Sequence, residues 1–294
     1  MKQKRPKNPS ELDIPVLLMN FPLTIDNKIP NNVYMDETEI YDLGKAFSQW
    51  LTLYKRLSQE ALVYVLPSYS PTNKRDLQDL TFVSNLGCYL PHIKNENIIV
   101  LSNFNSFPRR GEDLIGGPFF ESLNYKVIQP ETFFEGEADC KHVRDNLYIS
   151  AIGRTSSASH EWLKNEFSMD IVSIKTIPEL YHLDCILLPI NKNDVLVVTS
   201  VLDKEDIKKL EDVVNIISIP KQYSYESWTN AVIIGNTLFF AAKHEYAIRR
   251  FEKIMYKYDL ELENFDLSEF DKSGADLSCF VMILNRGKTN WQQM

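Results

Sequence analysis

This 294-residue chain has few cysteines, no long apolar runs and no recognisable secretory signal. Its 4 cysteines are too sparse for a disulfide framework, which favours a reducing, cytoplasmic setting. The longest apolar runs, 195–198 and 279–284, have the length of strands, whereas a spanning helix needs about 20 apolar residues. No apolar segment follows the basic N-terminus, and Lys2 excludes N-myristoylation. We therefore expect a soluble cytoplasmic protein with no membrane partner.

The chain also has no excess of positive charge. It carries 32 Lys and Arg against 40 Asp and Glu, a net charge of -8. Nucleic acids and anionic membranes reward a basic face, so the balance argues against both and fits a cationic small molecule better. No Gly/Ser linker or low-complexity segment divides the chain. We predict a flexible segment over 1–12, one domain over 13–288 and a C-terminal tail over 289–294.

Short apolar runs alternate with amphipathic segments along the whole chain. Strands are predicted at 14–19, 61–66, 97–101, 147–151, 171–175, 186–190, 195–199, 216–219, 232–234, 238–240 and 279–284, with two more flanking 85–87. Helices are predicted at 37–58, with Asp36 as its N-cap, and at 159–167, 203–213 and 243–258. Strand, strand, helix, strand recurs about every fifty residues, which indicates a repeat of small modules rather than one doubly wound sheet.

A nucleophilic cysteine needs a base, a group that orients the base and groups that fix the electrophile. The chain has only 5 histidines, and His182 lies in Tyr-His-Leu-Asp at the mouth of an apolar run. Side chains alternate along a strand, so His182 and Asp184 would face the same side and deliver a base and a carboxylate together. A strand-end histidine satisfied by ordinary hydrogen bonds is the alternative, and the spacing alone favours it.

Three further clusters carry polar groups. Residues 134–139 (Phe-Glu-Gly-Glu-Ala-Asp) place three carboxylates behind aromatic residues, as in a pocket for a cation. Asp79 and Asn85 bracket a predicted strand and could bind a planar, NH-rich group. Arg109 and Arg154 stand in polar turns and could bind a carboxylate through the guanidinium fork. Taken singly, each cluster is more ordinarily an acidic turn, a capped strand end or surface charge.

A zinc site is a competing interpretation. Cys140 with His142, and His182 with Cys185, could supply four ligands. The spacing is not that of a C-x2-C knuckle, and about forty residues separate the halves, so a metal site is the minor alternative and we expect no cofactor.

In their order along the chain, these segments resemble those of the amidinotransferase and arginine deiminase (pentein) superfamily of guanidine-modifying enzymes. The superfamily includes dimethylarginine dimethylaminohydrolase and the arginine dihydrolase domain of cyanobacteria, and the resemblance runs from about Ile14 to Arg286. The matching segments are 79–87 (D-x-x-F-x-x-N, then Gly), 109–112 (R-x-G-E), 134–139 (F-E-G-x-x-D), 153–155 (around the second arginine), 181–184 (H-L-D) and 272–279 (the approach to the cysteine). The Asn-Gly form of the first segment is closest to the dihydrolase branch.

The resemblance implies an α/β fold, a single-domain five-bladed propeller of ββαβ modules. It implies that Cys279 is the nucleophile and that His182 and Glu135 assist it. The substrate-binding residues that it implies are Asp79, Phe82, Asn85, Arg109, Asp139, Arg154 and Asp184. The implied activity is hydrolysis of the guanidinium group of arginine or a close derivative through a covalent cysteine adduct, in a protein that could be a homo-oligomer.

Two departures from the family pattern concern the substrate. Glu137 and Ala138 stand where the family has small residues and glycine, and the approach to Cys279 contains fewer glycines. If Glu137 faces the pocket, a substrate with additional positive charge would fit. Two alternatives stay open: an amidinotransferase that passes the amidino group to an amine, and a non-catalytic guanidinium-binding protein.

Overall fold

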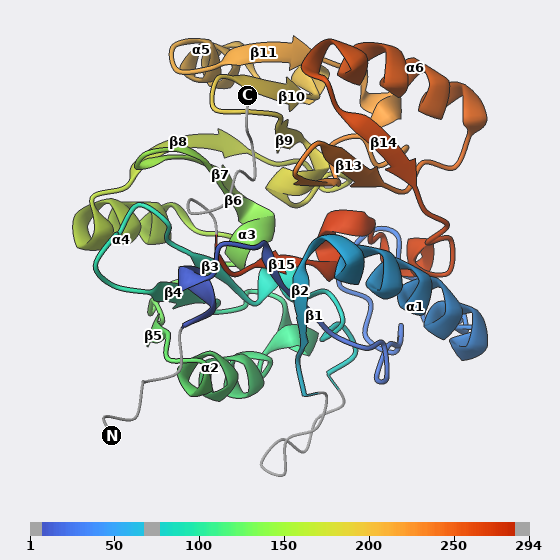
Figure 1. Ribbon diagram of the computed structural model, residues 1–294, viewed down its shortest axis with the longest axis horizontal. Coiled ribbons are helices and arrows are strands. Elements are labelled where there is room, and N and C mark those ends of the chain that lie inside the picture. The colour runs from blue at the N-terminus through green and yellow to red at the C-terminus, as the bar shows by residue number, and fades with distance from the viewer. Residues whose placement is uncertain (1–7, 68–76, 286–294) are drawn as a thin grey trace.

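In the computed structural model, which describes residues 8–67 and 77–285, the chain forms five three-stranded sheets arranged around a common centre (Figure 1). In spatial order the sheets are β15 (Met282–Ile283), β1 (Val16–Met19) and β2 (Leu62–Val65); β3 (Gly87–Tyr89), β4 (Ile98–Leu101) and β5 (Lys126–Ile128); β6 (Cys140–Arg144), β7 (Leu147–Ile152) and β8 (Asp170–Lys175); β9 (Leu187–Pro189), β10 (Asp194–Val197) and β11 (Asn215–Ser218); β12 (Val232–Ile234), β13 (Thr237–Phe240) and β14 (Glu261–Asn264).

Each sheet repeats one connectivity. An antiparallel pair is followed by a helix and then by a third strand, parallel to the middle one, as in β6, β7, α4 and β8. The five connecting helices of the described residues are α1 (Leu43–Glu60), α2 (Asp113–Ser122), α4 (Ser157–Phe167), α5 (Lys204–Glu211) and α6 (Glu245–Met255). A parallel partner needs such a crossover. The predicted α/β propeller of ββαβ modules is therefore confirmed.

The ring closes through both ends of the chain. Strand β15 pairs antiparallel with β1, with Leu17 opposite Ile283. Asn285 reinforces the closure, because its Oδ1 accepts from the Val16 amide at 2.9 Å and its Nδ2 donates to the Ile14 carbonyl at 2.6 Å. The first and the last described strands therefore belong to one sheet.

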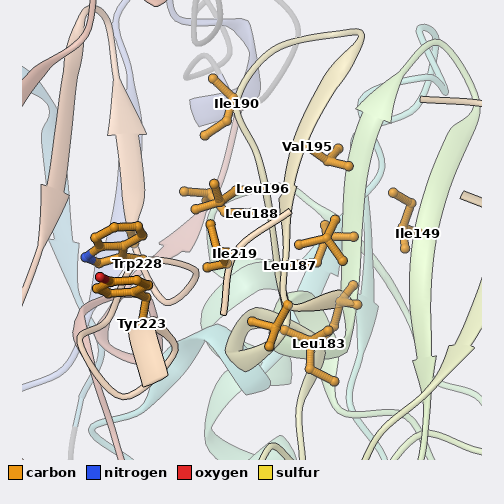
Figure 2. Packing of buried hydrophobic residues seen from close by; sticks show 14 of the residues in the cluster. Ile149, Leu183, Leu187, Leu188, Ile190, Val195, Leu196, Ile219, Tyr223 and Trp228 are labelled. Carbon is orange, nitrogen blue, oxygen red and sulfur yellow. The ribbon is translucent and has the colours of Figure 1, made fainter. Parts of the chain in front are cut away.

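Apolar side chains fill the spaces between neighbouring blades. Figure 2 shows Leu187 and Val195 of the β9–β11 sheet directed toward Ile149 of β7, all three fully buried. On another side of this cluster, Trp228 stacks on Tyr223 with ring centroids 3.9 Å apart. Burial of one such large side chain stabilises the fold by about 1.5–3 kcal/mol, so the blades are fixed firmly relative to one another.

The structure corrects several sequence-based boundaries. The first long helix begins at Leu43, not at 37, because Asp42 caps it by accepting from the Lys45 amide at 3.0 Å. Asp36, the predicted N-cap, instead closes a turn by accepting from the amide of Thr38 at 2.8 Å. Strands β5 and β14 and helix α2 were not predicted, since these segments carry no clear two- or 3.6-residue apolar period.

Within the predicted flexible segment 1–12, residues 8–12 are described and anchored. Asn8 donates from Nδ2 to the Leu123 carbonyl at 2.9 Å, and both Asn8 and Ser10 are buried. Residues 1–7, the loop 68–76 and the predicted tail 289–294 lie outside the described residues. None of the helices in the described ranges is long and apolar enough to cross a membrane.

Candidate active site

The first strand of each sheet unit is preceded by a short turn, and these turns meet. A 3-10 turn, η2 (Val83–Asn85), precedes β3; the single helical turn α3 (Gly136–Asp139) precedes β6; η4 (Leu183–Cys185) precedes β9; and η9 (Leu277–Phe280) precedes β15. Turn η2 contacts both α3 and η9, and α3 contacts η4. Side chains that are far apart in the sequence are gathered in this way.

His182 is held by the turns of two other blades. Its Nε2 lies 2.7 Å from Oε2 of Glu135 and 3.2 Å from Nδ2 of Asn85. The other ring nitrogen, Nδ1, forms no hydrogen bond within the described residues. Gly136 makes the approach of these turns close: its φ is +63°, and a Cβ there would lie 2.7 Å from the backbone of Asn85.

Glu135 is fully buried yet remains a strong acid. Burial by itself would raise its pKa. The hydrogen bond to His182 and the positive charges of His182, Arg154 and Arg109 outweigh that effect and lower the pKa of Glu135 to about 2. A carboxylate that stays ionised beside the imidazole orients the ring through this hydrogen bond.

Cys279 lies in η9, with the side chain 8% exposed. Burial raises the pKa of the Cys279 thiol well above its usual range, and the negative charge of Asp184 raises it further. Asp184 is fully buried, and its Oδ2 accepts from Oγ of Ser278 at 2.7 Å. The surroundings therefore favour a neutral thiol until positive charge arrives.

A cavity opens above these groups. It is lined by Asn31, Asn32, Asp79, Phe82, Asn85, Arg109, Arg154, Tyr181, His182, Ser273, Ala275 and Cys279. Seven of the ten site residues implied by the sequence are therefore in its wall. The other three, Glu135, Asp139 and Asp184, are buried behind it.

Arg109 is fixed from several directions. Its Nε and Nη2 contact the two carboxylate oxygens of Glu112 at 2.9 and 2.8 Å, and Nη2 also donates to the Phe82 carbonyl at 2.9 Å. Both side chains of the pair are almost completely buried. Such a pair restricts the guanidinium to one orientation, in which its Nη1 has no partner among the described residues.

Arg154 is held more loosely, with 15% of its side chain exposed. Its guanidinium lies 5.0 Å from the ring centroid of Tyr181 and 4.0 Å from Oε2 of Glu135, and Nη2 donates to the Asn31 carbonyl. The guanidinium is therefore partly accessible to a ligand, while Glu135 offsets part of its positive charge.

Asp79 also lies in the wall, where Nδ2 of Asn31 donates to its Oδ2 at 2.6 Å. Burial raises the pKa of Asp79. Asp139 has a different place: Oδ2 accepts from the amide and hydroxyl of Thr155, at 3.1 and 2.8 Å, and Oδ1 accepts from the Leu183 amide at 3.2 Å. Asp139 thus joins the turn after His182 to its neighbouring blade and does not reach the cavity.

Glu137 does not face the cavity above Cys279. Its Oε2 accepts from the Ile283 amide at 2.9 Å, and the side chain lines a separate space with Lys141 and Ser278. A substrate with additional positive charge was expected only if Glu137 faced the cavity, and Glu137 does not.

Three local expectations were wrong. His182 and Asp184 do not lie on one face of a strand, since 183–185 forms the turn η4. Cys279 likewise precedes the last strand, which starts at Met282, and the segment before Asn85 is a turn. In each case the chain must change direction at the blade entrance, and alternation of side chains does not apply there.

The wall also contains residues that the sequence reasoning did not select. These are Asn31, Asn32, Tyr181, Ser273 and Ala275. Asn31 and Asn32 come from the long loop after β1, where no periodicity marks them. Asn230 and Ser278 were missed as well, although Asn230 precedes β12 at the spacing by which Asn85 precedes β3.

The four residues of the zinc interpretation do not converge. Cys140 is in the core, His142 binds the Asp145 carbonyl at the surface, and His182 binds Glu135. In the part of the chain that the structure describes, no three His, Cys, Asp or Glu side chains are grouped so as to hold a metal ion.

No protein-family model matches the sequence. An uncharacterized protein of Caenorhabditis elegans is 26% identical over 253 residues, 83% of this chain and 85% of the relative. The uncharacterized protein YkgA of Bacillus subtilis is 26% identical over 196 residues, 64% and 65% of the two chains.

Solved structures are similar over nearly the whole chain. The N-terminal domain of ArgZ, a cyanobacterial arginine dihydrolase, superposes with a TM-score of 0.83 at 22% identity, over 93% of this chain and 98% of that domain. AgrE, solved with ornithine and NAD+, gives 0.81 at 23%, with 93% of this chain matching 39% of AgrE. A dimethylarginine dimethylaminohydrolase adduct gives 0.71 at 16%, over 92% and 99%. The chain therefore has the fold of the pentein superfamily, the five-bladed α/β propeller of these guanidine-modifying enzymes.

Proposed function

We propose that the protein is a hydrolase of the guanidinium group of arginine or a close derivative, acting through a covalent adduct on Cys279. The observation that carries the proposal is the composition of one cavity wall, which combines Cys279, His182 and two arginines, with Glu135 bonded to His182 behind it. A thiol beside an oriented imidazole is a nucleophile with its acid–base partner. The arginines supply the charge that a carboxylate at the other end of the substrate requires.

The bound cation starts the chemistry. A guanidinium next to Cys279 compensates the burial and the negative charge that disfavour its thiolate. The thiol then passes its proton to His182, and the sulfur bonds to the guanidinium carbon. Protonated His182 gives a proton to one nitrogen of the tetrahedral adduct, that C–N bond breaks, and ammonia or an amine leaves. A thiouronium-type adduct remains on the enzyme.

Water completes the turnover. It adds to the amidino carbon while His182 accepts one of its protons, and the C–S bond breaks to return the Cys279 thiolate. The product carries a ureido group, and one proton leaves with the released amine as ammonium. An amine in place of water would transfer the amidino group instead. We favour water because the segment 79–87, with Asn85 and the following glycine, resembles the dihydrolase branch.

Product analysis by mass spectrometry tests the proposal. The purified protein is incubated with arginine, methylated arginines, agmatine, and arginine plus glycine. We expect ureido or further hydrolysed products from one of the first two classes, and slower reaction of agmatine, which has no carboxylate for the arginines. Cys140→Ala is the matched control, because Cys140 is buried outside the cavity, and it should turn over like the wild type.

The other outcomes identify the alternatives. Formation of guanidinoacetate from arginine plus glycine would make the protein an amidinotransferase. Binding of arginine without any product, together with a Cys279 that chloroacetamidine does not label at neutral pH, would leave a non-catalytic guanidinium-binding protein.

A further inference from the structure

Asn230 has no role in the reaction described so far, yet it stands at the entrance of the remaining blade. The turns before β3, β6, β9 and β15 bring Asn85, Glu135, His182 and Cys279 to the site. Asn230 lies two residues before β12, the first strand of the remaining sheet, and is 3% exposed. The pseudo-symmetric repeat thus brings one polar side chain from each described blade to the same place.

The amide of Asn230 is oriented by the residue that precedes Cys279. Its Oδ1 accepts from the amide of Ser278 at 2.8 Å and shares the hydroxyl donor of Ser278, at 2.9 Å, with Oδ2 of Asp184. The neutral thiol of Cys279 also lies within donor distance of Oδ1, at 3.8 Å, and Nδ2 is directed to Sγ of Cys279 at 3.5 Å. That distance is within the range for a hydrogen bond to sulfur, whose van der Waals radius is larger than that of oxygen.

The backbone that carries Asn230 is fixed on both sides. Oγ of Ser227 donates to the Asn230 carbonyl at 2.9 Å, and Oγ1 of Thr229 donates to the Cys185 carbonyl at 2.9 Å. Between them, the Trp228 ring is fully buried in its aromatic stack. The donor is therefore preorganised, so little reorganisation is required when charge develops on the sulfur.

The sulfur has few other sources of stabilisation. Among the residues that the structure describes, Asn230 supplies the only side-chain donor at hydrogen-bond distance from Sγ. Asp184, which accepts a hydrogen bond from Oγ of Ser278, places negative charge near the Cys279 sulfur. A donor at Asn230 opposes that charge at the atom where the thiolate forms.

We propose that Asn230 is a catalytic residue whose amide donates to the Cys279 sulfur and stabilises its thiolate, with Ser278 holding the amide in the donating orientation. The part that this donor plays in turnover rests on the proposed function. The donor acts twice: when the thiol loses its proton before attack, and when the C–S bond breaks and the thiolate is expelled. Its interaction with sulfur weakens in between, when the sulfur is bonded to carbon and uncharged.

Alkylation of Cys279 without substrate tests the donor directly. The rate of carbamidomethylation by iodoacetamide is followed by peptide mass spectrometry from about pH 6 to pH 10, the range over which thiolate forms. Asn230→Asp retains an oxygen that accepts from Ser278 and replaces the donor by a second carboxylate oxygen. Asn230→Ala removes both groups. We expect the rate near neutral pH to fall about tenfold or more in Asn230→Asp, corresponding to about one pKa unit, and less in Asn230→Ala.

Asn264→Asp is the matched control. Asn264 has the same bonding pattern, accepting from the Ala242 amide at 2.6 Å and donating to the Ala242 carbonyl at 3.1 Å, but it lies in β14. Its alkylation profile should stay within about twofold of the wild type. Thermal unfolding of all variants identifies any that fail to fold. If Asn230→Asp fails to fold, the alkylation rate of Asn230→Ala is the test of the donor.

For turnover, we expect the Asn230 variants to lower kcat with little change in KM, because Asn230 does not line the cavity proposed to bind the substrate. Folded Asn230 variants that are alkylated with the wild-type pH profile would overturn the inference. A shifted profile in a protein whose wild type turns over no guanidine would overturn the proposed hydrolase and uphold the thiolate donor.

Discussion

The two ends of the cavity are built on different principles. At the end with Cys279, the side chains come from turns that precede the first strands, and they bind one another, as Glu135 binds His182. At the other end, Arg109 and Arg154 come from loops after the middle strands β4 and β7. Each donates to a backbone carbonyl and also faces a carboxylate, Glu112 for Arg109 and Glu135 for Arg154. The groups at the Cys279 end set the protonation states of the reacting side chains, and the arginines at the other end set the position of a ligand.

This difference predicts different kinetic signatures. Changes near Cys279 should lower kcat, because they act on protonation and on bond making. Changes at the arginines should raise KM, because they act on ground-state binding of a carboxylate. A change near Cys279 that raised only KM, or a change at the arginines that lowered only kcat, would contradict this division.

Cys279→Ser is expected to have the largest effect. A serine hydroxyl is far less acidic than a thiol, so the nucleophile is lost while the cavity keeps its shape. Turnover of arginine should fall by at least about 10³-fold. Binding, measured by calorimetry, should remain within a few-fold. An unchanged release of ammonia or urea by this variant would refute covalent catalysis at Cys279.

Glu135→Gln is expected to come next. The amide still contacts His182 but cannot stabilise its charged form, so kcat should fall about 10²–10⁴-fold with a smaller change in KM. Glu137→Gln is the matched control, because Glu137 is the neighbouring carboxylate and binds the Ile283 amide away from the cavity. Its kcat should stay within about threefold of the wild type. Equal losses in both variants would indicate a structural effect of this turn.

The same pair of variants has a pH signature. The pKa of Glu135 is lowered to about 2 in the fold, below its ordinary value. A lowered carboxyl pKa stabilises the fold above its unfolded-state pKa, and that contribution is lost as pH falls toward 2. Between about pH 4.5 and pH 2, the free energy of unfolding should therefore fall more steeply for the wild type than for Glu135→Gln.

Arg154→Ala tests the other end. We expect KM for arginine to rise about tenfold or more, corresponding to one charge-assisted hydrogen-bonded contact, with kcat little changed. KM for agmatine, which has no carboxylate, should barely change, so the two substrates become more alike. Arg109→Ala is unsuitable for this purpose, because it leaves Glu112 buried without its partner, which costs about 3–5 kcal/mol of stability. Loss of kcat alone in Arg154→Ala would contradict the assignment.

The blades could be predicted from the sequence because their strands and helices carry apolar periods. The site residues could be named only through the order of short motifs, since the turns that hold them have no period. Asp139 shows the limit of a motif: it follows Glu135 in the same segment, yet its oxygens bind Thr155 and Leu183. Asn230 shows the opposite case. It contacts Cys279, but the two residues meet only in the closed ring, and no short motif marks Asn230.

Asp139→Asn is expected to have the smallest effect on catalysis and a measurable effect on stability. The carboxamide introduced by this substitution would keep one acceptor but turn its NH₂ group toward the donors of Thr155, so unfolding free energy should fall by about 1–3 kcal/mol at low pH. Burial raises the pKa of Asp139 to about 6 in the fold. A raised pKa contributes stability below the unfolded-state pKa and loses it as pH rises through 6, so the wild type should lose stability over that range and the variant should not. The penalty of Asp139→Asn should therefore shrink from pH 4 to pH 7 in denaturant titrations. A penalty that grows over this range would show that the hydrogen bonds from Thr155 and Leu183 outweigh burial, and that Asp139 is ionised like the groups at the Cys279 end of the cavity.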